Sequence, residues 1–235
     1  MAYKISDLLV EIPEAGGMSP RCVEYLTDEQ GIADIVVCKE KYQADKWPEL
    51  SVESNIYLQS GFQFYHALLD FDGLMLHSSA VALHGKAYLF SGPCGVGKST
   101  HTNLWRTIFG EDVVVFNDDK PALRRLDGRW YAYGTPWCGK DGINVNMKVP
   151  LAGICFLKQS DRNEIRRIDG KEALAKVISQ TTYHLRDAEK MQRMLENVSK
   201  LINEIPIYEL CNRPERAAAE LSYRVMNENS PEVIL

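Results

Sequence analysis

The stretch from Lys86 to Ser99 decides the fold, and it reads Lys-Ala-Tyr-Leu-Phe-Ser-Gly-Pro-Cys-Gly-Val-Gly-Lys-Ser. Residues 86–91 form an apolar, strand-like run, and residues 92–97 are rich in glycine, which interrupts regular structure. Residues 99–109 then have the character of a helix, and Gly110 stands where a helix C-terminus favours glycine. A strand, a glycine-rich loop and a helix in this order predict an α/β protein.

The loop between this strand and this helix matches the phosphate-binding pattern G-x-x-x-x-G-K-[ST] at every required position. Its glycines allow successive backbone N–H groups to point at phosphate oxygens, and the start of the helix adds its positive dipole end. In this pattern Lys98 reaches the β- and γ-phosphates, and the Ser99 hydroxyl ligates Mg²⁺. We therefore expect ATP or another nucleoside triphosphate, with Mg²⁺. The expected nucleotide-binding residues are Gly92, Pro93, Cys94, Gly95, Val96, Gly97, Lys98, Ser99 and Thr100.

A pair of carboxylates, Asp118 and Asp119, directly follows a short apolar strand predicted at 112–117. A phosphate loop needs an acidic partner for Mg²⁺, and two adjacent carboxylates near a triphosphate suggest a metal ligand and a general base. A turn or helix cap is the alternative interpretation, because Asp-Asp before Lys-Pro also makes a good turn. The position of the pair after the loop favours the functional interpretation.

The segments around this stretch predict a mixed sheet that contains hairpins, rather than a purely parallel one. Two hairpins are expected, with turns at 84–85 and 127–128, between strands at 74–83 and 86–91 and between strands at 122–126 and 129–133. Further strands are expected at 32–38, 151–157 and 205–210, and helices at 55–71, at 171–202 with one break near 181–183, and at 214–226. We assign residues 1–70 to a small N-terminal α+β subdomain and residues 71–235 to the domain that holds the loop.

Composition excludes several classes of protein. Hydrophobic residues make up 45% and charged residues 25% of the 235, as in globular domains with a full core. Lys and Arg (27) against Asp and Glu (32) give a net charge of −5, which argues against nucleic acid and anionic membranes as partners. No apolar run approaches the roughly 18 residues of a membrane span, and residues 1–17 lack the apolar middle of a signal peptide. The six cysteines form no Cys-x-x-Cys pair, so reduced thiols and a cytoplasmic location are expected.

The order of His77, the loop at 92–99 and the pair Asp118-Asp119 resembles the catalytic domain of HPr kinase/phosphorylase and HPr-kinase-like proteins. These proteins share a P-loop fold with nucleotide-dependent phosphoenolpyruvate carboxykinases. His77 precedes the first loop glycine by an interval similar to the family's. The resemblance is good over residues 74–125, looser to the end of the chain and weak over residues 1–60.

The resemblance implies roles for the matching residues. Lys98 and Ser99 would be phosphate and Mg²⁺ ligands, and His77 would lie near the transferred phosphoryl group. One of Asp118 and Asp119 would be the base, and the other would be linked to the metal; the resemblance leaves the order open, and we place Asp119 with Ser99 among the metal candidates. Without the resemblance, His77 would read as an interior histidine.

The sequence also departs from the family. The Glu-Ile-Arg-Gly signature of the bifunctional enzymes is missing, and residues 137–142 (Trp-Cys-Gly-Lys-Asp-Gly) stand in its place. The resemblance therefore implies neither HPr as acceptor nor the dephosphorylating activity, because relatives without the signature resemble kinases of other hydroxyls. Lys140 is a candidate for binding the γ-phosphate or an acidic acceptor, with a solvated loop lysine as the alternative. Arg213 is a weaker candidate for nucleotide contact.

The leading hypothesis is an ATP- and Mg²⁺-dependent kinase that transfers the γ-phosphoryl group to a serine-type hydroxyl on a small molecule, peptide or small protein. The donor is left open among ATP, GTP and pyrophosphate, and the resemblance is compatible with a homo-oligomer. The alternative is a nucleotide-binding regulatory module or ATPase that uses residues 1–70 to dock a partner. Carboxykinase-like chemistry is disfavoured, because those relatives are much longer.

Overall fold

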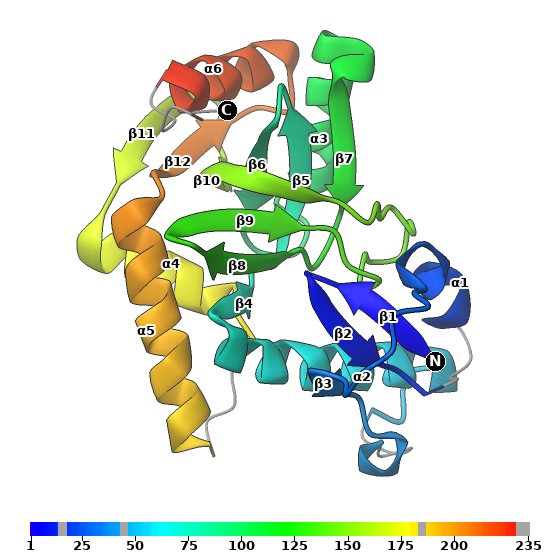
Figure 1. The fold of residues 1–235 in the computed structure, drawn as a ribbon. Coiled ribbons are helices and arrows are strands. Elements are labelled where there is room, and N and C mark those ends of the chain that lie inside the picture. Colours follow the sequence, from blue (N-terminus) through cyan, green and yellow to red (C-terminus); the bar gives the residue numbers. More distant parts are fainter. Residues whose placement is uncertain (14–17, 43–46, 183–186, 229–235) are drawn as a thin grey trace.

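The computed structural model describes residues 1–13, 18–42, 47–182 and 187–228 (Figure 1). Short 3-10 turns follow or join several of its elements, at Val23–Tyr25, Lys39–Lys41, Leu69–Phe71 and Gly110–Asp112. The helices and strands are β1 (Ala2–Ile5), β2 (Leu8–Glu11), α1 (Ser19–Cys22), β3 (Ile35–Val36), α2 (Val52–Leu68), β4 (Gly73–Met75), β5 (Ser78–Leu83), β6 (Lys86–Ser91), α3 (Lys98–Phe109), β7 (Val113–Asn117), β8 (Ala122–Leu126), β9 (Arg129–Tyr133), β10 (Lys148–Gln159), β11 (Glu164–Ile168), α4 (Gly170–Ser179), α5 (Ala188–Glu204), β12 (Ile207–Asn212) and α6 (Arg216–Glu228).

The main sheet is built around β10, the longest strand. Its first residues, Lys148 to Pro150, pair antiparallel with β9, and its later residues pair in parallel with β6 and β12. A register shift between Leu151 and Gly153 lies where the strand passes from one set of partners to the other. One half of the sheet has the order β4-β8-β9-β10, and the other has the order β11-β12-β10-β6-β5-β7. The predicted mixed α/β architecture with hairpins is confirmed.

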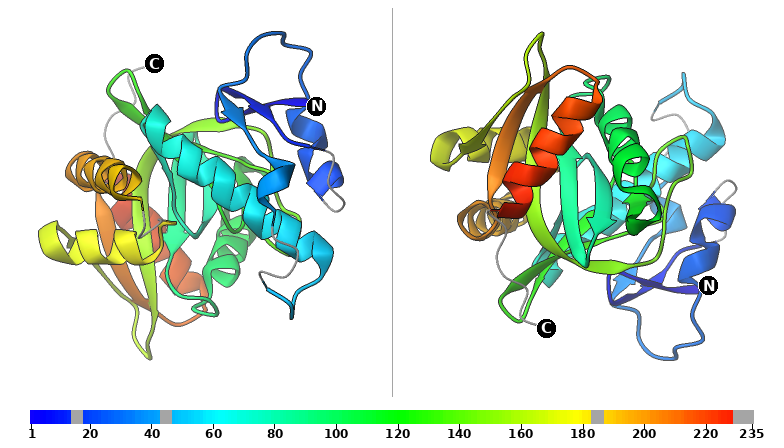
Figure 2. Two further views of the ribbon diagram at one scale, coloured as in Figure 1. Left: turned by 90° about the horizontal axis from the view of Figure 1, so that it is seen from below. Right: turned by 90° about the horizontal axis from the view of Figure 1, so that it is seen from above.

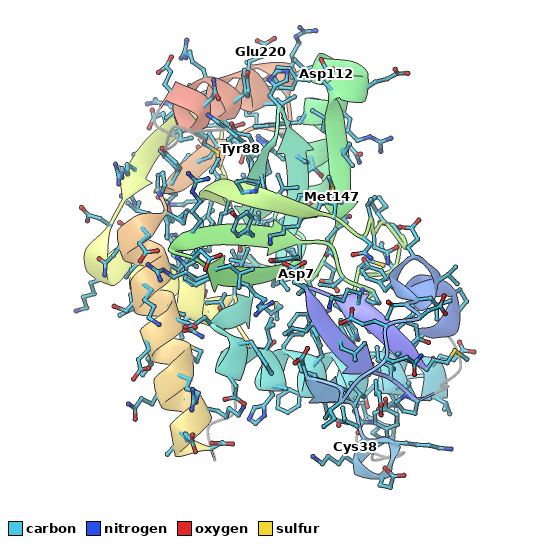
Figure 3. The ribbon with its side chains drawn as sticks, in the orientation of Figure 1. Asp7, Cys38, Tyr88, Asp112, Met147 and Glu220 are labelled. Atoms are coloured by element: carbon cyan, nitrogen blue, oxygen red, sulfur yellow. The ribbon has the colours of Figure 1, made fainter. Side chains whose placement is uncertain are left out.

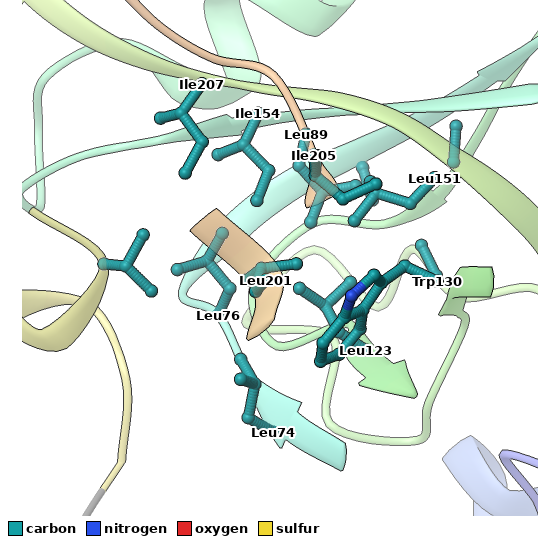
Figure 4. Packing of buried hydrophobic residues seen from close by; sticks show 14 of the residues in the cluster. Leu74, Leu76, Leu89, Leu123, Trp130, Leu151, Ile154, Leu201, Ile205 and Ile207 are labelled. Carbon is teal, nitrogen blue, oxygen red and sulfur yellow. The ribbon is translucent and has the colours of Figure 1, made fainter. Parts of the chain in front are cut away.

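Two layers of helices cover the sheet on opposite faces. Alternation along β6 shows this directly, because Tyr88 and Phe90 pack with Trp105 of α3, whereas Leu89 packs in the cluster that includes Leu201 of α5. The right-hand view of Figure 2 shows α3 and α6 side by side over the sheet. Figure 4 shows the other cluster, in which Ile154 and Ile207 lie near Leu89. Each face of the sheet therefore has its own apolar core.

A separate three-stranded sheet, β1-β2-β3, lies beside α2 at the N-terminal end (Figure 1). Its apolar cluster is continuous with residues of the main sheet and includes Trp137, whose ring stacks on Phe64 of α2. Two polar ties add to this packing. Asp7, labelled in Figure 3, accepts hydrogen bonds of 2.8 Å from Tyr133 and Lys148, and the buried Arg124 donates to the Ser6 carbonyl at 2.6 Å. The division of the chain at residue 70 stays a prediction.

Several local expectations need correction. The single strand expected at 74–83 is two strands, since β4 pairs with β8 while β5 pairs with β6 and β7. The strand predicted at 112–117 has the apolar sequence typical of a strand in the interior of a sheet, but it lies at the end of the sheet, where Val114 is 38% exposed. Only residues 35–36 of the strand expected at 32–38 are paired, and β1, β2 and β11 were not expected. The end of the predicted helix break, Tyr183, lies outside the described residues.

The remaining expectations for hairpins and helices are confirmed. His84 and Gly85 have φ values of 50° and 74°, and Asp127 and Gly128 have values of 48° and 81°, as two-residue hairpin turns require. Gly110 ends α3 with a φ of 60°. No helix in the described part of the chain has the length and apolar character to cross a bilayer.

Candidate functional site

The direction of β5 brings the predicted parts of the site together. β5 runs antiparallel to both β6 and β7, so its first residue, Ser78, lies beside the ends of the other two. Ser78 is paired with Ser91, the last residue before the loop, and its N–H donates to the Asp119 carbonyl at 3.0 Å. The Ser91 hydroxyl donates to the His77 carbonyl at 2.8 Å. The loop, His77 and the carboxylate pair therefore meet at one end of three neighbouring strands.

The loop itself has the backbone that its sequence predicts. Gly92, Gly95 and Gly97 have φ values of 138°, 78° and 107°, in the region that side chains with a Cβ avoid. Gly95 is exposed, and no hydrogen bond within the described part of the chain engages the backbone N–H of Cys94, Gly95 or Gly97. Free N–H groups at the start of α3 form a cradle suited to an anion. The exposed hydroxyls of Ser99 and Thr100 lie on the first turn of the same helix.

Lys98 lies folded over this loop. Its ammonium donates to the carbonyls of Gly92 at 2.9 Å and Pro93 at 3.2 Å. Burial lowers the pKa of the Lys98 amine, and the negative charges of Asp119 and Asp118 act in the opposite direction on this pKa. The ammonium thus lies in the field of both carboxylates, and its hydrogen-bond partners among the described residues are carbonyl oxygens, which phosphate oxygens can replace.

A buried polar network holds the two carboxylates in place. The side-chain oxygen of Asn117 accepts from the N–H groups of Asp119 at 3.0 Å and Lys120 at 2.8 Å. Its amide nitrogen donates at 3.1 Å to the carbonyl and the hydroxyl of Thr135, whose hydroxyl donates to the Lys120 carbonyl. Tyr65 also donates to that carbonyl. Because the side chains of Asn117, Thr135 and Tyr65 in this network all have hydrogen-bond partners, the network holds the turn that carries Asp118 and Asp119 in one conformation.

The two carboxylates have different surroundings. Oδ2 of Asp119 accepts a hydrogen bond of 3.0 Å from Tyr57 and forms an ion pair with Lys120, while its Oδ1 lies 3.4 Å from Nε2 of His77. Oδ1 of Asp118, in contrast, is buried and has no hydrogen-bond partner within the described residues. A buried carboxylate oxygen without a partner is costly unless a further ligand satisfies it.

The side chain of Asp118 fits the Mg²⁺ that the loop pattern implies. Mg²⁺ prefers oxygen ligands, and in phosphoryl-transfer sites it takes one or two from the protein and others from phosphates and water. The orphaned oxygen of Asp118 and the exposed hydroxyl of Ser99 are ligands of this kind. The described residues contain no group of three or more His, Cys, Asp or Glu side chains that could hold a metal.

His77, whose Nε2 faces Asp119, is held through its Nδ1 and its backbone by Gln180. The imidazole Nδ1 lies 3.1 Å from the Gln180 side-chain oxygen, and the two backbones are joined by a hydrogen bond of 2.8 Å from His77 N–H to the Gln180 carbonyl. Burial lowers the pKa of His77, as does the charge of Lys98, while Asp119 acts in the opposite direction. His77 is therefore neutral at pH 7. It lines, with Asp119 and Gln180, a pocket of about 290 Å³.

A larger pocket of about 530 Å³ lies on the other side of Asp119. Tyr57 of α2 forms part of its wall, with its ring beneath the guanidinium of Arg21 at 5.0 Å. Lys120, Lys140 and Gly139 also line it, and the Gly139 N–H donates to the Tyr57 hydroxyl at 2.9 Å. Asp119 and Lys120 line both pockets, so they stand between the two.

The sequence-predicted residues are distributed unevenly over this site. His77, Lys98 and the two aspartates are brought together, and Lys140 is exposed at the larger pocket. Arg213 follows β12, which ends at the same end of the sheet as β6, but no contact within the described residues joins its side chain to the loop or to the carboxylates. Arg21, Tyr57 and Gln180 were missed, because each reaches the site from a distant part of the chain. For Lys120 the sequence held one indication of a place in the site, namely its position directly after the carboxylate pair.

Comparisons with known proteins place the chain in a family. No curated protein matches the sequence significantly. Among solved structures, the HPr(Ser) kinase/phosphatase from Coxiella burnetii matches with a TM-score of 0.38 and 11% identity, over 66% of this chain and 88% of that one. The model of the family described as SynChlorMet cassette protein ScmC matches residues 36–213. Because this match spans more than half of the 235 residues, the chain belongs to the ScmC family.

Proposed function

We propose that the protein is an ATP- and Mg²⁺-dependent kinase that transfers the γ-phosphoryl group to a hydroxyl of a small molecule, peptide or small protein. One observation carries the proposal: β5 aligns the phosphate loop, His77 and the pair Asp118-Asp119 at the same end of the sheet. Phosphoryl transfer needs little covalent chemistry from the protein, and positioning with electrostatic stabilisation is most of what it requires. These residues supply both.

The nucleotide phosphates would occupy the loop cradle. There the unengaged N–H groups of Cys94, Gly95 and Gly97 would donate to phosphate oxygens, and Lys98 would exchange its two carbonyl partners for them. The positive charge of Lys98 lies where negative charge spreads over the transferred group. Thr100, exposed on the first turn of α3, is a further candidate for phosphate contact.

The contacts favour Asp118, with Ser99, as the side chains that would hold Mg²⁺, which reverses the assignment of Asp119 that we made from the sequence. Oδ1 of Asp118 lacks a partner, whereas both oxygens of Asp119 face side chains of the protein. Bound Mg²⁺ would neutralise charge on the phosphates. Asp118 and Ser99 would orient it from the protein side.

Asp119 is then the general base. It lines both pockets, where an acceptor hydroxyl can approach it. In the transfer step the acceptor oxygen bonds to the γ-phosphorus, the bond from that phosphorus to the β–γ bridging oxygen breaks, ADP leaves, and the hydroxyl proton passes to Asp119. A neutral His77 that donates Nδ1–H to Gln180 turns its unprotonated Nε2 towards Oδ1 of Asp119, so the two side chains can share this proton.

The test is transfer of label from γ-labelled ATP with Mg²⁺ to a panel of acceptors: free serine, free threonine, hydroxyl-bearing peptides and HPr. GTP and pyrophosphate are compared as donors. Label should appear on one acceptor class, should be lost in Lys98→Ala and should persist in the matched control Lys171→Ala, which changes an exposed lysine of α4. Release of label as free phosphate without any acceptor would contradict a kinase and would indicate an ATPase or regulatory module.

A further inference from the structure

We infer that the pocket of about 530 Å³ beside Asp119 binds the phosphoryl acceptor through a carboxylate, so that the acceptor is a hydroxyl compound with a carboxylate close to its hydroxyl. The inference deepens the proposed function and rests on it, because it takes Asp119 as the group that the hydroxyl approaches.

Uncharged groups of the protein hold Arg21 in place. Its Nη1 donates to the Gly139 carbonyl and lies 3.5 Å from the Cys138 sulfur, and its guanidinium lies over the Tyr57 ring. No carboxylate pairs with it among the described residues, although Lys120 in the same pocket is paired with Asp119. A planar guanidinium that is held in position with its charge unpaired is suited to a carboxylate, which it can bind with two parallel hydrogen bonds.

The charges that line the pocket also match a monoanion. Three basic side chains, Arg21, Lys120 and Lys140, face two acidic ones, Glu53 and Asp119. Lys120 and Asp119 form an ion pair with each other. Arg21, Lys140 and Glu53 remain, with a net charge of +1. That excess suits one carboxylate better than a phosphate dianion.

The pocket also sets how far apart the hydroxyl and the carboxylate of the acceptor can be. The hydroxyl end of Tyr57 donates to Asp119, and the face of the same ring lies beneath Arg21. A single phenol ring therefore separates the group that receives the proton from the group that receives the carboxylate. This span fits a small hydroxy acid, or a peptide in which an acidic residue is adjacent to the hydroxyl residue. Leu50 and Leu58 add an apolar part of the lining that either can contact.

The inference also gives the N-terminal part of the chain a role. Arg21 comes from α1 and Tyr57 from α2, so residues before the main sheet supply the carboxylate-binding side of the pocket. The loop at 137–142, which stands in place of the family signature, supplies Gly139 and Lys140 to the same pocket, and Gly139 contacts both Arg21 and Tyr57.

The test uses pairs of acceptors that differ only in the carboxylate: L-serine against L-serinamide, and N-acetyl-Ser-Glu-amide against N-acetyl-Ser-Gln-amide. Transfer from ATP is measured as kcat/KM for each. At least one acid should exceed its amide by tenfold or more, and the pair that does so identifies the source as a free acid or a peptide. In Arg21→Gln this ratio should fall close to one while the KM for ATP stays within twofold. Arg21→Lys should restore part of the ratio.

Two further variants make the result independent of folding. Arg129→Gln, which changes an exposed arginine of β9, should leave the acid-to-amide ratio unchanged. If Arg21→Gln does not fold, Lys140→Gln, at an exposed position of the pocket, should lower the same ratio.

A calorimetric titration of the same four compounds, with a non-hydrolysable ATP analogue present, separates this inference from the proposed function. Binding of an acid but not its amide, lost in Arg21→Gln and seen without any transfer, would support the pocket and contradict the kinase. Equal turnover of acid and amide in both pairs would overturn the pocket and leave the kinase standing. The absence of both binding and turnover for all four compounds would overturn the inference.

Discussion

The hydroxyl of Tyr57 lies 3.0 Å from Oδ2 of Asp119 and 2.9 Å from the backbone nitrogen of Gly139, and it donates to the first and accepts from the second. One phenol therefore joins the proposed base to the loop at 137–142, which also lines the pocket. Burial raises the pKa of Tyr57, as does the nearby charge of Asp119, so this hydroxyl stays protonated and remains a donor at every working pH.

Replacing Tyr57 by Phe should slow transfer about tenfold, which is the rate equivalent of about 1.4 kcal/mol. The variant keeps the ring but leaves Asp119 without one hydrogen bond and releases Gly139. The affinity for ATP should change less than twofold, because the loop is untouched. Steady-state kinetics and calorimetry measure the two quantities. Tyr131→Phe, on β9, is the control, and equal losses in both variants would contradict a specific role for Tyr57.

The two aspartates should respond differently to conversion to asparagine. Asp118→Asn should raise the Mg²⁺ concentration for half-maximal activity tenfold or more, because a carboxylate ligand is lost. Asp119→Asn should lower kcat by a factor of about 100 or more with the Mg²⁺ requirement unchanged, since general-base catalysis contributes on that scale. A Mg²⁺ titration of both variants, ended with EDTA to confirm metal dependence, measures this.

The matched control for these two variants is Asp127→Asn in the β8–β9 turn, where the φ of 48° suits asparagine. This variant should behave as wild type in both measurements. A raised Mg²⁺ requirement in Asp119→Asn, with none in Asp118→Asn, would restore the assignment of Asp119 as the metal ligand.

Stability should fall in acid because of His101. The side chain is buried on α3, where its Nε2 lies 2.9 Å from the Ser222 hydroxyl, and burial lowers the pKa of His101 from 6.5 to about 4. At pH values between these two, His101 binds a proton in the unfolded chain but not in the folded protein. The stability that the neutral, buried His101 contributes is therefore complete above pH 6.5 and is lost as the pH falls towards 4. Between pH 7.5 and 5 the loss should be about 2 kcal/mol.

Urea unfolding at several pH values measures this loss. His101→Asn should reduce the decrease in unfolding free energy over that range, whatever its effect at neutral pH. His84→Asn, at an exposed turn residue with a φ of 50°, should leave the pH dependence unchanged. The same decrease in all three proteins would show that His101 does not cause it.

The close approach of Gly134 to the Val145 carbonyl should make Gly134→Ala strongly destabilising. A Cβ at this position would lie 1.8 Å from the carbonyl oxygen, so backbone must move. We expect a loss above about 3 kcal/mol in the free energy of unfolding, at the upper end of overpacking effects. Gly85→Ala is the comparison, because its φ is +74° but nothing lies within 4 Å, and it should cost about 1–2 kcal/mol. Thermal unfolding of the two variants ranks them.

The sequence predicted those parts of the fold that short-range patterns determine. The loop at 92–97, the turns at 84–85 and 127–128 and the end of α3 at Gly110 depend on glycine at particular backbone angles, which the sequence displays. The short strands of the N-terminal sheet carry no such signal, because pairing between β2 and the two residues of β3 depends on packing with α2. The place of β7 at the end of the sheet also depends on pairing that its apolar sequence does not reveal.

In the candidate site, too, the residues that belong to short-range patterns could be predicted and those placed by tertiary packing could not. Lys98, Asp118 and Asp119 are next to recognisable local patterns. Tyr57 and Arg21 are not, since tertiary structure alone brings the α2 tyrosine to Asp119 and the α1 arginine to the ring of that tyrosine. The different surroundings of the two aspartates could not be predicted either, because at the end of a strand the alternation of side chains no longer tells which oxygen is enclosed.

The antiparallel course of β5 has a consequence for how this protein can be modified. The ends of β6 and β7 are kept in place by hydrogen bonds along β5, while the turn that joins β5 to β6 lies at the opposite end of those strands. A flexible linker or a small reporter domain inserted between His84 and Gly85 is therefore added at the end of the strands opposite the candidate site. Such a fusion should keep the geometry of that site intact and provides a place to attach a probe or an affinity handle.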